Sequence, residues 1–107
     1  MGYKIKFTFT AEQDLREIGF YVLDESKNLD TALNHAAKLR SSVKNLDKFP
    51  ESGSNPRDRF LVNLGYKFIP EGDYLTFYKI DKNAKIIYIA AVLNGKTDYV
   101  KILKKRL

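Results

Sequence analysis

The stretch that decides the fold is YLTFYKIDKNAKIIYIAAV, residues 74–92. Two runs rich in β-branched and aromatic residues, 74–80 and 86–92, are separated by the turn-forming cluster 81–84, a pattern that predicts a β-hairpin. In the second run neither alternating face is polar, so we expect its strand to be covered on both sides and to lie inside a sheet. Such a strand needs neighbouring strands and a helical layer from the rest of the chain.

Upstream of this hairpin, residues 3–9 alternate between apolar and polar side chains, which is the period of a half-buried strand. Thr10 follows, and we expect it to cap a helix that begins directly after it. Leu15, Ile18 and Val22 recur at the spacing of one helical face. This face is expected to pack on the sheet.

A second helix is expected after the turn-rich segment 25–30, with Asp30 as its cap and its end before Phe49-Pro50. Its apolar residues recur at steps of four and three: Ala32, Ala36, Leu39, Val43 and Leu46. The short connection predicts an antiparallel helical hairpin. His35 lies near this apolar seam without a nearby carboxylate or second imidazole, so we interpret it as a helix residue without a ligand or base role.

The segment 50–59 is rich in helix and strand breakers and is predicted to be a loop between the hairpin and the sheet. Residues 60–69 alternate again and are predicted to form a strand, with Gly65 marking a bulge or a close backbone approach. Residues 70–73 are expected to make the tight turn into the strand that begins at residue 74.

Asp98 is expected to cap a short final helix from Tyr99 to about Lys105. The predicted fold is therefore α+β in the order β-α-α-β-β-β, a single domain over residues 1–107. The helical hairpin packs on one face of a small, mainly antiparallel sheet, and the opposite face stays open or concave. Candidates to line that open face are Tyr3, Lys67, Tyr74 or Tyr78, and the loops around Arg57 and Lys96.

Composition limits the chemistry. The 107 residues contain no Cys and one His, which excludes disulfides, thiolate catalysis and metal sites built on thiolates or several imidazoles. The formal net charge of +6 favours an acidic partner, such as a phosphate backbone, an acidic protein segment or an anionic membrane surface. The N-terminus lacks the pattern of a signal peptide, and the longest apolar run, 86–93, is too short to span a bilayer. We expect a soluble cytoplasmic protein without a cofactor.

A set of motifs covers nearly the whole chain: Ala11-x-x-Asp14-Leu15-x-x-Ile18-x-x-Tyr21, Phe49-Pro50-x-x-Gly53, Gly65-Tyr66-Lys67, Gly72-Asp73-Tyr74-Leu75-x-Phe77-Tyr78-Lys79-Ile80, Val92-Leu93-Asn94-Gly95 and Asp98-Tyr99. In order and spacing this set resembles the RelE/ParE family of type II toxin-antitoxin toxins, on the ParE-like, plasmid-stabilisation side. The resemblance implies a small growth-arresting toxin that is held inactive by an antitoxin whose C-terminal segment wraps it.

The resembled family has two branches with different chemistry. RelE-like members cleave messenger RNA in the ribosome with Lys, Arg and Tyr side chains, whereas ParE-like members are described as poisons of DNA gyrase without a known bond-cleaving reaction. Lys67 and Tyr99 match the RNA-cleaving branch, but Leu75 replaces its arginine after the hairpin tyrosine. Asn94 replaces its frequent histidine, and Lys96 replaces an arginine that binds phosphate in a bidentate manner. These departures weaken the nuclease interpretation more than the toxin interpretation.

We therefore predict a ParE-like toxin that inhibits growth by binding DNA gyrase and is neutralised by a cognate antitoxin, with no membrane partner and no small-molecule substrate. The residues expected to bind the target are Asn94, Lys96, Lys101, Lys104, Lys105 and Arg106. The C-terminal cations among them have a second interpretation, which is charge compensation of a helix dipole.

Two alternatives remain open. The first is an enzyme, a ribosome-dependent mRNA endoribonuclease, with the candidate catalytic residues Arg57, Arg59, Lys67, Lys96 and Tyr99. The second is a non-toxic basic module that binds nucleic acid with a steep salt dependence. Four tyrosines could serve as stacking platforms for bases but are interpreted as sheet-packing residues: Tyr66, Tyr74, Tyr78 and Tyr88.

Overall fold

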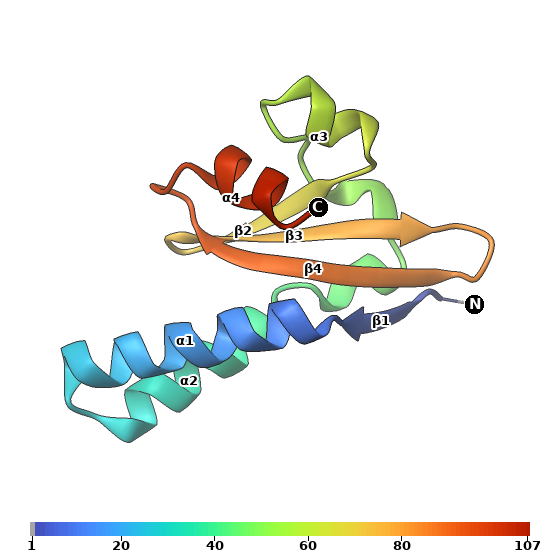
Figure 1. Cartoon of the computed structure of the whole chain (residues 1–107). Helices are drawn as coiled ribbons and strands as arrows, with labels where there is room; N and C mark the ends of the chain where they lie inside the picture. Colours follow the sequence, from blue (N-terminus) through green and yellow to red (C-terminus); the bar gives the residue numbers. More distant parts are fainter. Residues whose placement is uncertain (1) are drawn as a thin grey trace.

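The computed structural model describes residues 2–107. Its sheet consists of β1 (Lys4–Phe7), β2 (Lys67–Glu71), β3 (Tyr74–Asp81) and β4 (Ile86–Asn94) in the spatial order β1-β4-β3-β2. Strand β1 runs parallel to β4, and the other neighbours are antiparallel (Figure 1). Both the hairpin and the interior position of β4 are confirmed, and the fold is α+β as predicted.

Helices lie on both faces of the sheet (Figure 1). The helical segments of residues 2–107 are, in chain order, α1 (Phe9–Ser26), α2 (Leu29–Ser41), the 3-10 turns η1 (Lys44–Asp47) and η2 (Pro50–Ser52), α3 (Arg59–Asn63) and α4 (Tyr99–Lys105). The α1–α2 hairpin lies below one face, and α3 and α4 lie above the other. The short C-terminal helix is confirmed with its predicted bounds, because the Asp98 carboxylate accepts a hydrogen bond from the Lys101 N–H at 3.2 Å.

The hairpin packs on the sheet through the face that the sequence predicts. Leu15 and Ile18 of α1 and Leu39 of α2 form a buried cluster with Tyr74 and Val92 of the sheet. Removing this apolar surface from water is the main force that holds the hairpin on the sheet.

The opposite face is not open along its whole length, and this expectation was wrong at one end. Leu61 of α3 and Tyr99 and Leu103 of α4 form a second buried cluster on Phe77 and Ala91 of the sheet. Tyr3, Tyr74 and Tyr78, which were candidates to line the open face, instead pack in clusters on the hairpin side. The reason for Tyr74 and Tyr78 is strand alternation. They are four positions apart in β3, so both side chains point to the same face of the sheet, which is the face that the hairpin covers.

The first strand ends and the first helix begins earlier than the alternation of residues 3–9 indicates. Thr8, not Thr10, is the cap, and its hydroxyl accepts a hydrogen bond from the Ala11 N–H at 3.1 Å. Phe9 is therefore the first residue of α1, and its side chain is exposed. Satisfying an otherwise unpaired helical N–H outweighs one more apolar position in the strand.

The second helix also differs at both ends. Asn28 caps α2 in place of Asp30, accepting a hydrogen bond from the Thr31 N–H at 3.1 Å. The helix ends at Ser41, where the hydroxyls of Ser41 and Ser42 donate to backbone carbonyls of the preceding turn. Such local side-chain bonds compete with helix continuation, so the chain reaches Phe49 through 3-10 geometry.

The largest correction concerns residues 60–69, which are not one strand. The Asp58 carboxylate accepts a hydrogen bond from the Leu61 N–H at 3.1 Å and so starts α3. Gly65, with φ +94°, ends this helix, while Gly65 and Tyr66 donate their N–H groups to the carbonyls of Val62 and Leu61 in a Schellman motif. Only β2 remains extended, and because it includes Pro70 and Glu71, the turn into β3 is shorter than predicted.

A buried tyrosine fixes the segment between α2 and α3. The Tyr78 hydroxyl donates to the Pro50 carbonyl at 2.7 Å and accepts from the Gly53 N–H at 3.0 Å. Burial raises the pKa of Tyr78, and the hydrogen bond from Gly53 offsets part of this rise. The Tyr78 hydroxyl thus uses its hydrogen as a donor and its oxygen as an acceptor inside the core.

Candidate functional site

The end of the sheet where β3 begins and β4 ends carries three of the positions at which nuclease chemistry was considered. Leu75 pairs with Leu93 and packs against the cluster under α3 and α4. The Asn94 side chain accepts a hydrogen bond from the Lys96 N–H at 2.8 Å, so its amide oxygen is used in the turn between β4 and α4. At this end of the sheet, therefore, Leu75 has a packing role and Asn94 stabilises a turn.

Arg57 and Tyr99 are brought together by the loop before α3. The Tyr99 ring is buried against Phe77, with ring centroids 5.1 Å apart, and its hydroxyl reaches the Arg57 Nε at 3.4 Å. The Arg57 guanidinium carbon lies 5.5 Å from the centroid of the Tyr99 ring, and the hydrogen bond raises the pKa of Arg57. Arg57 is thus held as a permanent cation over a buried aromatic ring.

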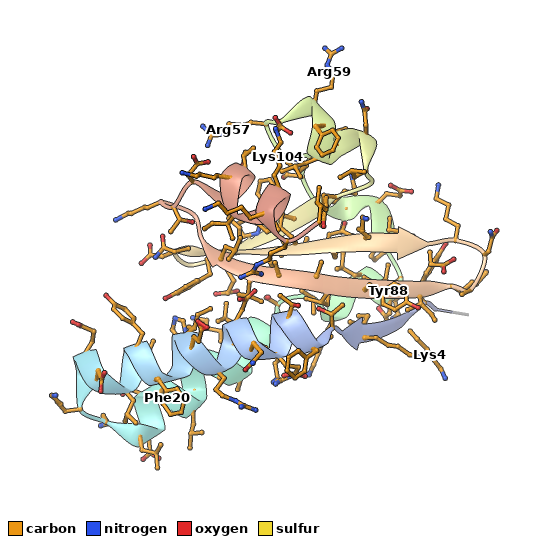
Figure 2. The ribbon with its side chains drawn as sticks, in the orientation of Figure 1. Lys4, Phe20, Arg57, Arg59, Tyr88 and Lys104 are labelled. Carbon is orange, nitrogen blue, oxygen red and sulfur yellow. The ribbon has the colours of Figure 1, made fainter. Side chains whose placement is uncertain are left out.

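The other nuclease candidates are not joined to this pair by any hydrogen bond or ion pair within residues 2–107. Lys67 begins β2, and its ammonium donates to the Asn55 amide oxygen at 3.1 Å. Arg59 is the first residue of α3 and projects away from the sheet (Figure 2). Lys96 is exposed in the turn before α4.

Helix α4 presents three exposed lysines, and an anchored arginine, Arg106, follows its last residue. Lys101, Lys104 and Lys105 are exposed, and Lys104 lies 3.4 Å from an Asp58 oxygen and 5.4 Å from the centroid of the Phe60 ring. The carboxylates of Asp58 and Asp98 are both used to cap helices. The three exposed lysines of α4 therefore outnumber the two nearby carboxylates, Asp58 and Asp98.

Arg106 has a different environment from the α4 lysines. Its two terminal nitrogens each lie 2.9 Å from an oxygen of Asp14 in α1, and the hydrogen bonds raise the pKa of Arg106. Asp14 is 8% exposed and also accepts a hydrogen bond from the Val92 N–H at 3.0 Å. A bidentate pair in this setting fixes the end of α4 against α1 and the sheet.

Acidic and basic side chains are unevenly distributed along the chain. The hairpin helices, residues 9–41, contain six acidic and four basic side chains, whereas residues 57–107 contain five acidic and eleven basic ones. The segment 57–107, which contains α3 and α4, therefore carries the excess of positive charge, with Arg57, Arg59 and Lys104 at its surface (Figure 2).

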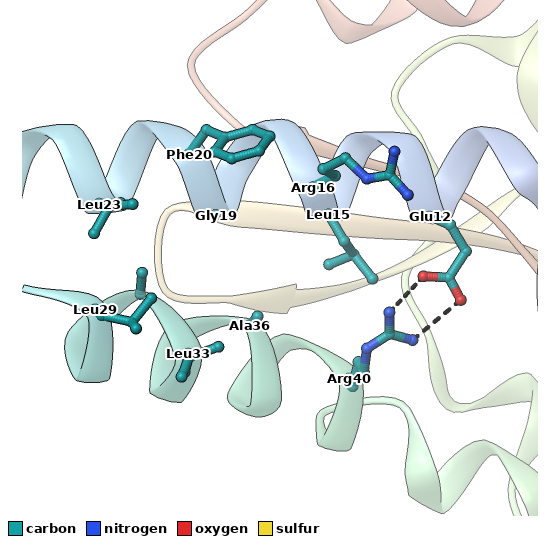
Figure 3. A pocket seen from close by; sticks show the side chains of 11 residues that line it. Glu12, Leu15, Arg16, Gly19, Phe20, Leu23, Leu29, Leu33, Ala36 and Arg40 are labelled. Atoms are coloured by element: carbon teal, nitrogen blue, oxygen red, sulfur yellow. Dashed lines mark hydrogen bonds and ion pairs between the residues drawn. The ribbon is translucent and has the colours of Figure 1, made fainter.

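An apolar groove between α1 and α2 was not predicted. It encloses about 320 Å³ and is lined chiefly by apolar side chains that include Phe20, Leu29 and Leu33, each well exposed (Figure 3). The ion pair between Glu12 and Arg40 closes one end. The sequence signal was present, because these apolar residues fall outside the sheet-facing positions of both helices.

The ring of His35 packs edge-on against Tyr74, with centroids 5.4 Å apart, and its buried Nδ1 has no hydrogen-bond partner in the described part of the chain. Across residues 2–107, no three His, Asp or Glu side chains gather within reach of one metal ion. Over the same residues, the helices are too short or too polar to cross a membrane.

Comparisons with known proteins give a consistent family pattern. Residues 5–99 match the family described as the ParE toxin of the type II toxin-antitoxin system parDE. No curated protein matches the chain. A chain of the chromosomal ParDE system of P. aeruginosa is similar in structure, with a TM-score of 0.72 and 17% identity over 88% of this chain and 97% of that one.

Two solved structures from RelE-type systems are also similar. A chain of the RelBE2 toxin-antitoxin complex of Mycobacterium tuberculosis has a TM-score of 0.60 and 23% identity over 88% of this chain and 99% of that one. A double mutant of the E. coli toxin RelE in the free state has a TM-score of 0.64 and 15% identity, covering 100% of both chains. At these identities the similarity concerns the fold.

Proposed function

This chain belongs to the ParE toxin family of type II toxin-antitoxin systems, and on that premise we propose that it arrests growth by binding DNA gyrase and not by cutting RNA. The observation that carries the proposal is Leu75. At the position where RNA-cleaving relatives place an arginine, this side chain is the register partner of Leu93 and packs, partly buried, against the cluster under α3 and α4. An apolar group cannot stabilise the charge that develops on a phosphate in transit.

The neighbouring groups support binding in preference to bond cleavage. Asn94 has no proton to exchange near neutral pH, and its amide oxygen is committed to the Lys96 N–H. Tyr99 is buried, and its hydroxyl is in contact with a permanent cation. General acid–base cleavage of RNA requires a pair of groups that exchange protons, and inhibitory binding does not.

We place the target contacts on α4 and the turn that precedes it, where Lys96, Lys101, Lys104 and Lys105 are exposed. These cations suit an acidic protein surface, which they would attract and orient on approach. Arg106 contributes through its bond to Asp14, which holds the helix in place for the lysines.

Reversing the charge of these lysines tests this assignment. The triple variant Lys101→Glu, Lys104→Glu, Lys105→Glu is expected to inhibit plasmid supercoiling by purified gyrase at least about tenfold more weakly. The matched control is Lys38→Glu, Lys44→Glu, Lys48→Glu, which makes the same change in net charge at exposed positions away from α4. Equal inhibition by the two triple variants would move the target contact off α4.

The same protein should leave messages intact on translating ribosomes. In a purified translation system, mapping of RNA ends is expected to show no new ends after its addition, while supercoiling is inhibited at the same concentration. New ends at ribosomal positions, lost in Arg57→Ala and Tyr99→Phe, would overturn the proposal in favour of the endoribonuclease.

Family membership implies a cognate antitoxin, and we propose that one helix of this antitoxin occupies the groove between α1 and α2. Phe20, Leu29 and Leu33 expose more than half of their surfaces there. An amphipathic helix with apolar residues on one face would cover such a groove. The excess of acidic residues in the hairpin suits a helix with basic flanks.

Gly19 allows the groove to be blocked without disturbing the core, because a Cβ at this position would meet nothing within 4 Å. The variant Gly19→Phe is expected to remain toxic but to bind the antitoxin about 100-fold more weakly, as measured by calorimetric titration and by rescue of growth on co-expression. Gly19→Ala is the control, and it should keep antitoxin affinity while stabilising the fold by about 0.5–1 kcal/mol. If Gly19→Phe were neutralised as well as Gly19→Ala, the antitoxin would bind elsewhere.

A further inference from the structure

At the end of the sheet away from Leu75, four side chains line up across one face. Lys6 of β1 is the register partner of Tyr88 in β4, and Tyr88 is the partner of Lys79 in β3. The Lys79 ammonium lies 4.8 Å from the centroid of the Tyr66 ring, just before β2. We call Lys6, Tyr88, Lys79 and Tyr66 the cross-strand row.

The row faces the same side as α3 and α4, and its Tyr66 end is buried in the cluster that these helices cover. Ile87 and Ile89 are fully buried on the hairpin side, so Tyr88 between them points to the opposite face, and 37% of it is exposed. Ile5 and Phe7 pack on the hairpin side too, which places Lys6 on the face of Tyr88. Along β3, Lys79 is ~13 Å from Leu75, so the row lies at the other end of this strand.

A hollow of about 570 Å³ opens at Tyr88 and Lys79. Its wall is formed by Leu64 and Gly65, where the chain leaves α3. Gly65 has no side chain, and the space around its Cα is open, since a Cβ there would meet nothing within 4 Å. The hollow is therefore not narrowed at this residue. The hollow thus combines an exposed aromatic ring, an apolar wall and a cation.

The charge around the row is positive. Lys4, Lys6 and Lys79 form no salt bridge with any of residues 2–107. The carboxylate that lines the hollow is Asp81, and one of its oxygens accepts a hydrogen bond from the Ala84 N–H at 3.0 Å in the β-turn. Lys82 on the rim is paired with Glu51.

We propose that the cross-strand row is a binding site for single-stranded nucleic acid. One base would stack on Tyr88 in the hollow, and the flanking phosphates would lie against Lys6 and Lys79. Exposed aromatic rings between cations on a sheet surface are how sequence-tolerant single-strand binding works in general. An acidic peptide would use the lysines, but its carboxylates have no π-face to stack on the exposed ring. The site does not depend on gyrase being the target, and it would let the toxin hold nucleic acid beside its protein target.

The test is fluorescence anisotropy of a labelled oligothymidylate about 12 nucleotides long with the purified full chain. Tyr88→Ala is expected to weaken binding about tenfold, because it removes the ring on which the base stacks. Tyr88→Phe keeps the ring and is expected to bind as tightly as the unmodified chain. Lys79→Gln should lower the slope of log affinity against log salt by about 0.7. Tyr21→Ala and Lys38→Gln, at exposed positions on the helical hairpin, are the matched controls and should change neither quantity.

Thermal melting of each variant shows whether it is folded, and the Tyr88→Phe variant separates loss of the ring from loss of structure. Equal affinity of Tyr88→Ala and the unmodified chain would overturn the proposal. Polyglutamate binding as tight as oligothymidylate binding, with the same loss in Lys79→Gln, would also overturn it and would indicate an acidic protein partner.

Discussion

Replacing Gly53 by alanine is expected to lower the free energy of unfolding by about 3 kcal/mol, because the new methyl group has no room. A Cβ at this position would lie 2.5 Å from the Tyr78 hydroxyl oxygen, 2.7 Å from Tyr78 Cε1 and 2.9 Å from the Phe68 carbonyl oxygen. The Phe68 carbonyl cannot move away easily, since it accepts the Ser54 N–H at 2.9 Å. Either the tyrosine or the loop must therefore shift, and the hydrogen bonds of the Tyr78 hydroxyl are lost in both cases.

Urea denaturation followed by circular dichroism measures this effect. Gly19→Ala is the control, because it adds the same methyl group in open space and should stabilise the protein. Tyr78→Phe alone should cost about 1–3 kcal/mol by leaving the Pro50 carbonyl and the Gly53 N–H without their partner. The double variant Gly53→Ala, Tyr78→Phe should cost less than the sum of the two, because the closest clash disappears with the hydroxyl. Strict additivity would show that the Tyr78 hydroxyl is not what excludes a side chain at Gly53.

The effect should extend to the surface. Gly53 fixes the start of the loop that carries Arg57 to the Tyr99 hydroxyl. The motif Phe49-Pro50-x-x-Gly53 supported the resemblance at the level of sequence, and the structure gives its physical reason. The motif closes a loop over a buried tyrosine 25 residues further along the chain.

The parts of the fold that could be predicted are those with a long, regular signal. The runs 74–80 and 86–92 are rich in β-branched and aromatic residues, and the second run lacks a polar face. The helical spacing of Leu15, Ile18 and Val22 persists over several turns. The cap at Asp98 is a local signal, and it gave the bounds of α4 correctly. Each of these patterns is decided by residues that are close in sequence.

Residues 60–69 misled the prediction because their alternation imitates a strand. A helix of five residues is too short for helical periodicity to compete with such a pattern. The signals that decide the outcome lie at its ends, with a cap at Asp58 and a positive φ at Gly65. Weighing caps above alternation in a segment this short would have found α3.

The candidate sites show the same division. The exposure of the α4 lysines follows from a local helix, whereas the pairing of Arg106 with Asp14 joins residues 92 positions apart. The cross-strand row depends on the parallel register of β1 with β4, which sets Lys6 beside Tyr88. Register between distant strands cannot be read from one sequence, because it is fixed by packing and not by local pattern.

Replacing Asp14 by alanine is expected to lower the free energy of unfolding by about 3–5 kcal/mol. Asp14 accepts hydrogen bonds from the Val92 N–H and from both terminal nitrogens of Arg106. Strand β1 ends at Phe7, so at Val92 the Asp14 carboxylate provides the acceptor that a longer strand would have provided. Alanine leaves both a buried backbone N–H and a half-buried guanidinium without a partner.

Two further variants separate the roles of this carboxylate, with urea denaturation as the measurement. Asp14→Asn keeps an oxygen for the Val92 N–H but loses the ionic bond to Arg106, so it should cost less than Asp14→Ala. Arg106→Leu leaves the backbone bond intact, and it should increase hydrogen exchange in α4 more than in α2, because only α4 loses its anchor. In a double-mutant cycle, Asp14→Ala and Arg106→Leu should couple by at least about 1 kcal/mol. If the two changes were additive and exchange in α4 were unchanged, Asp14 would matter only for the sheet, and the α4 lysines would be positioned by Tyr99 and Leu103 alone.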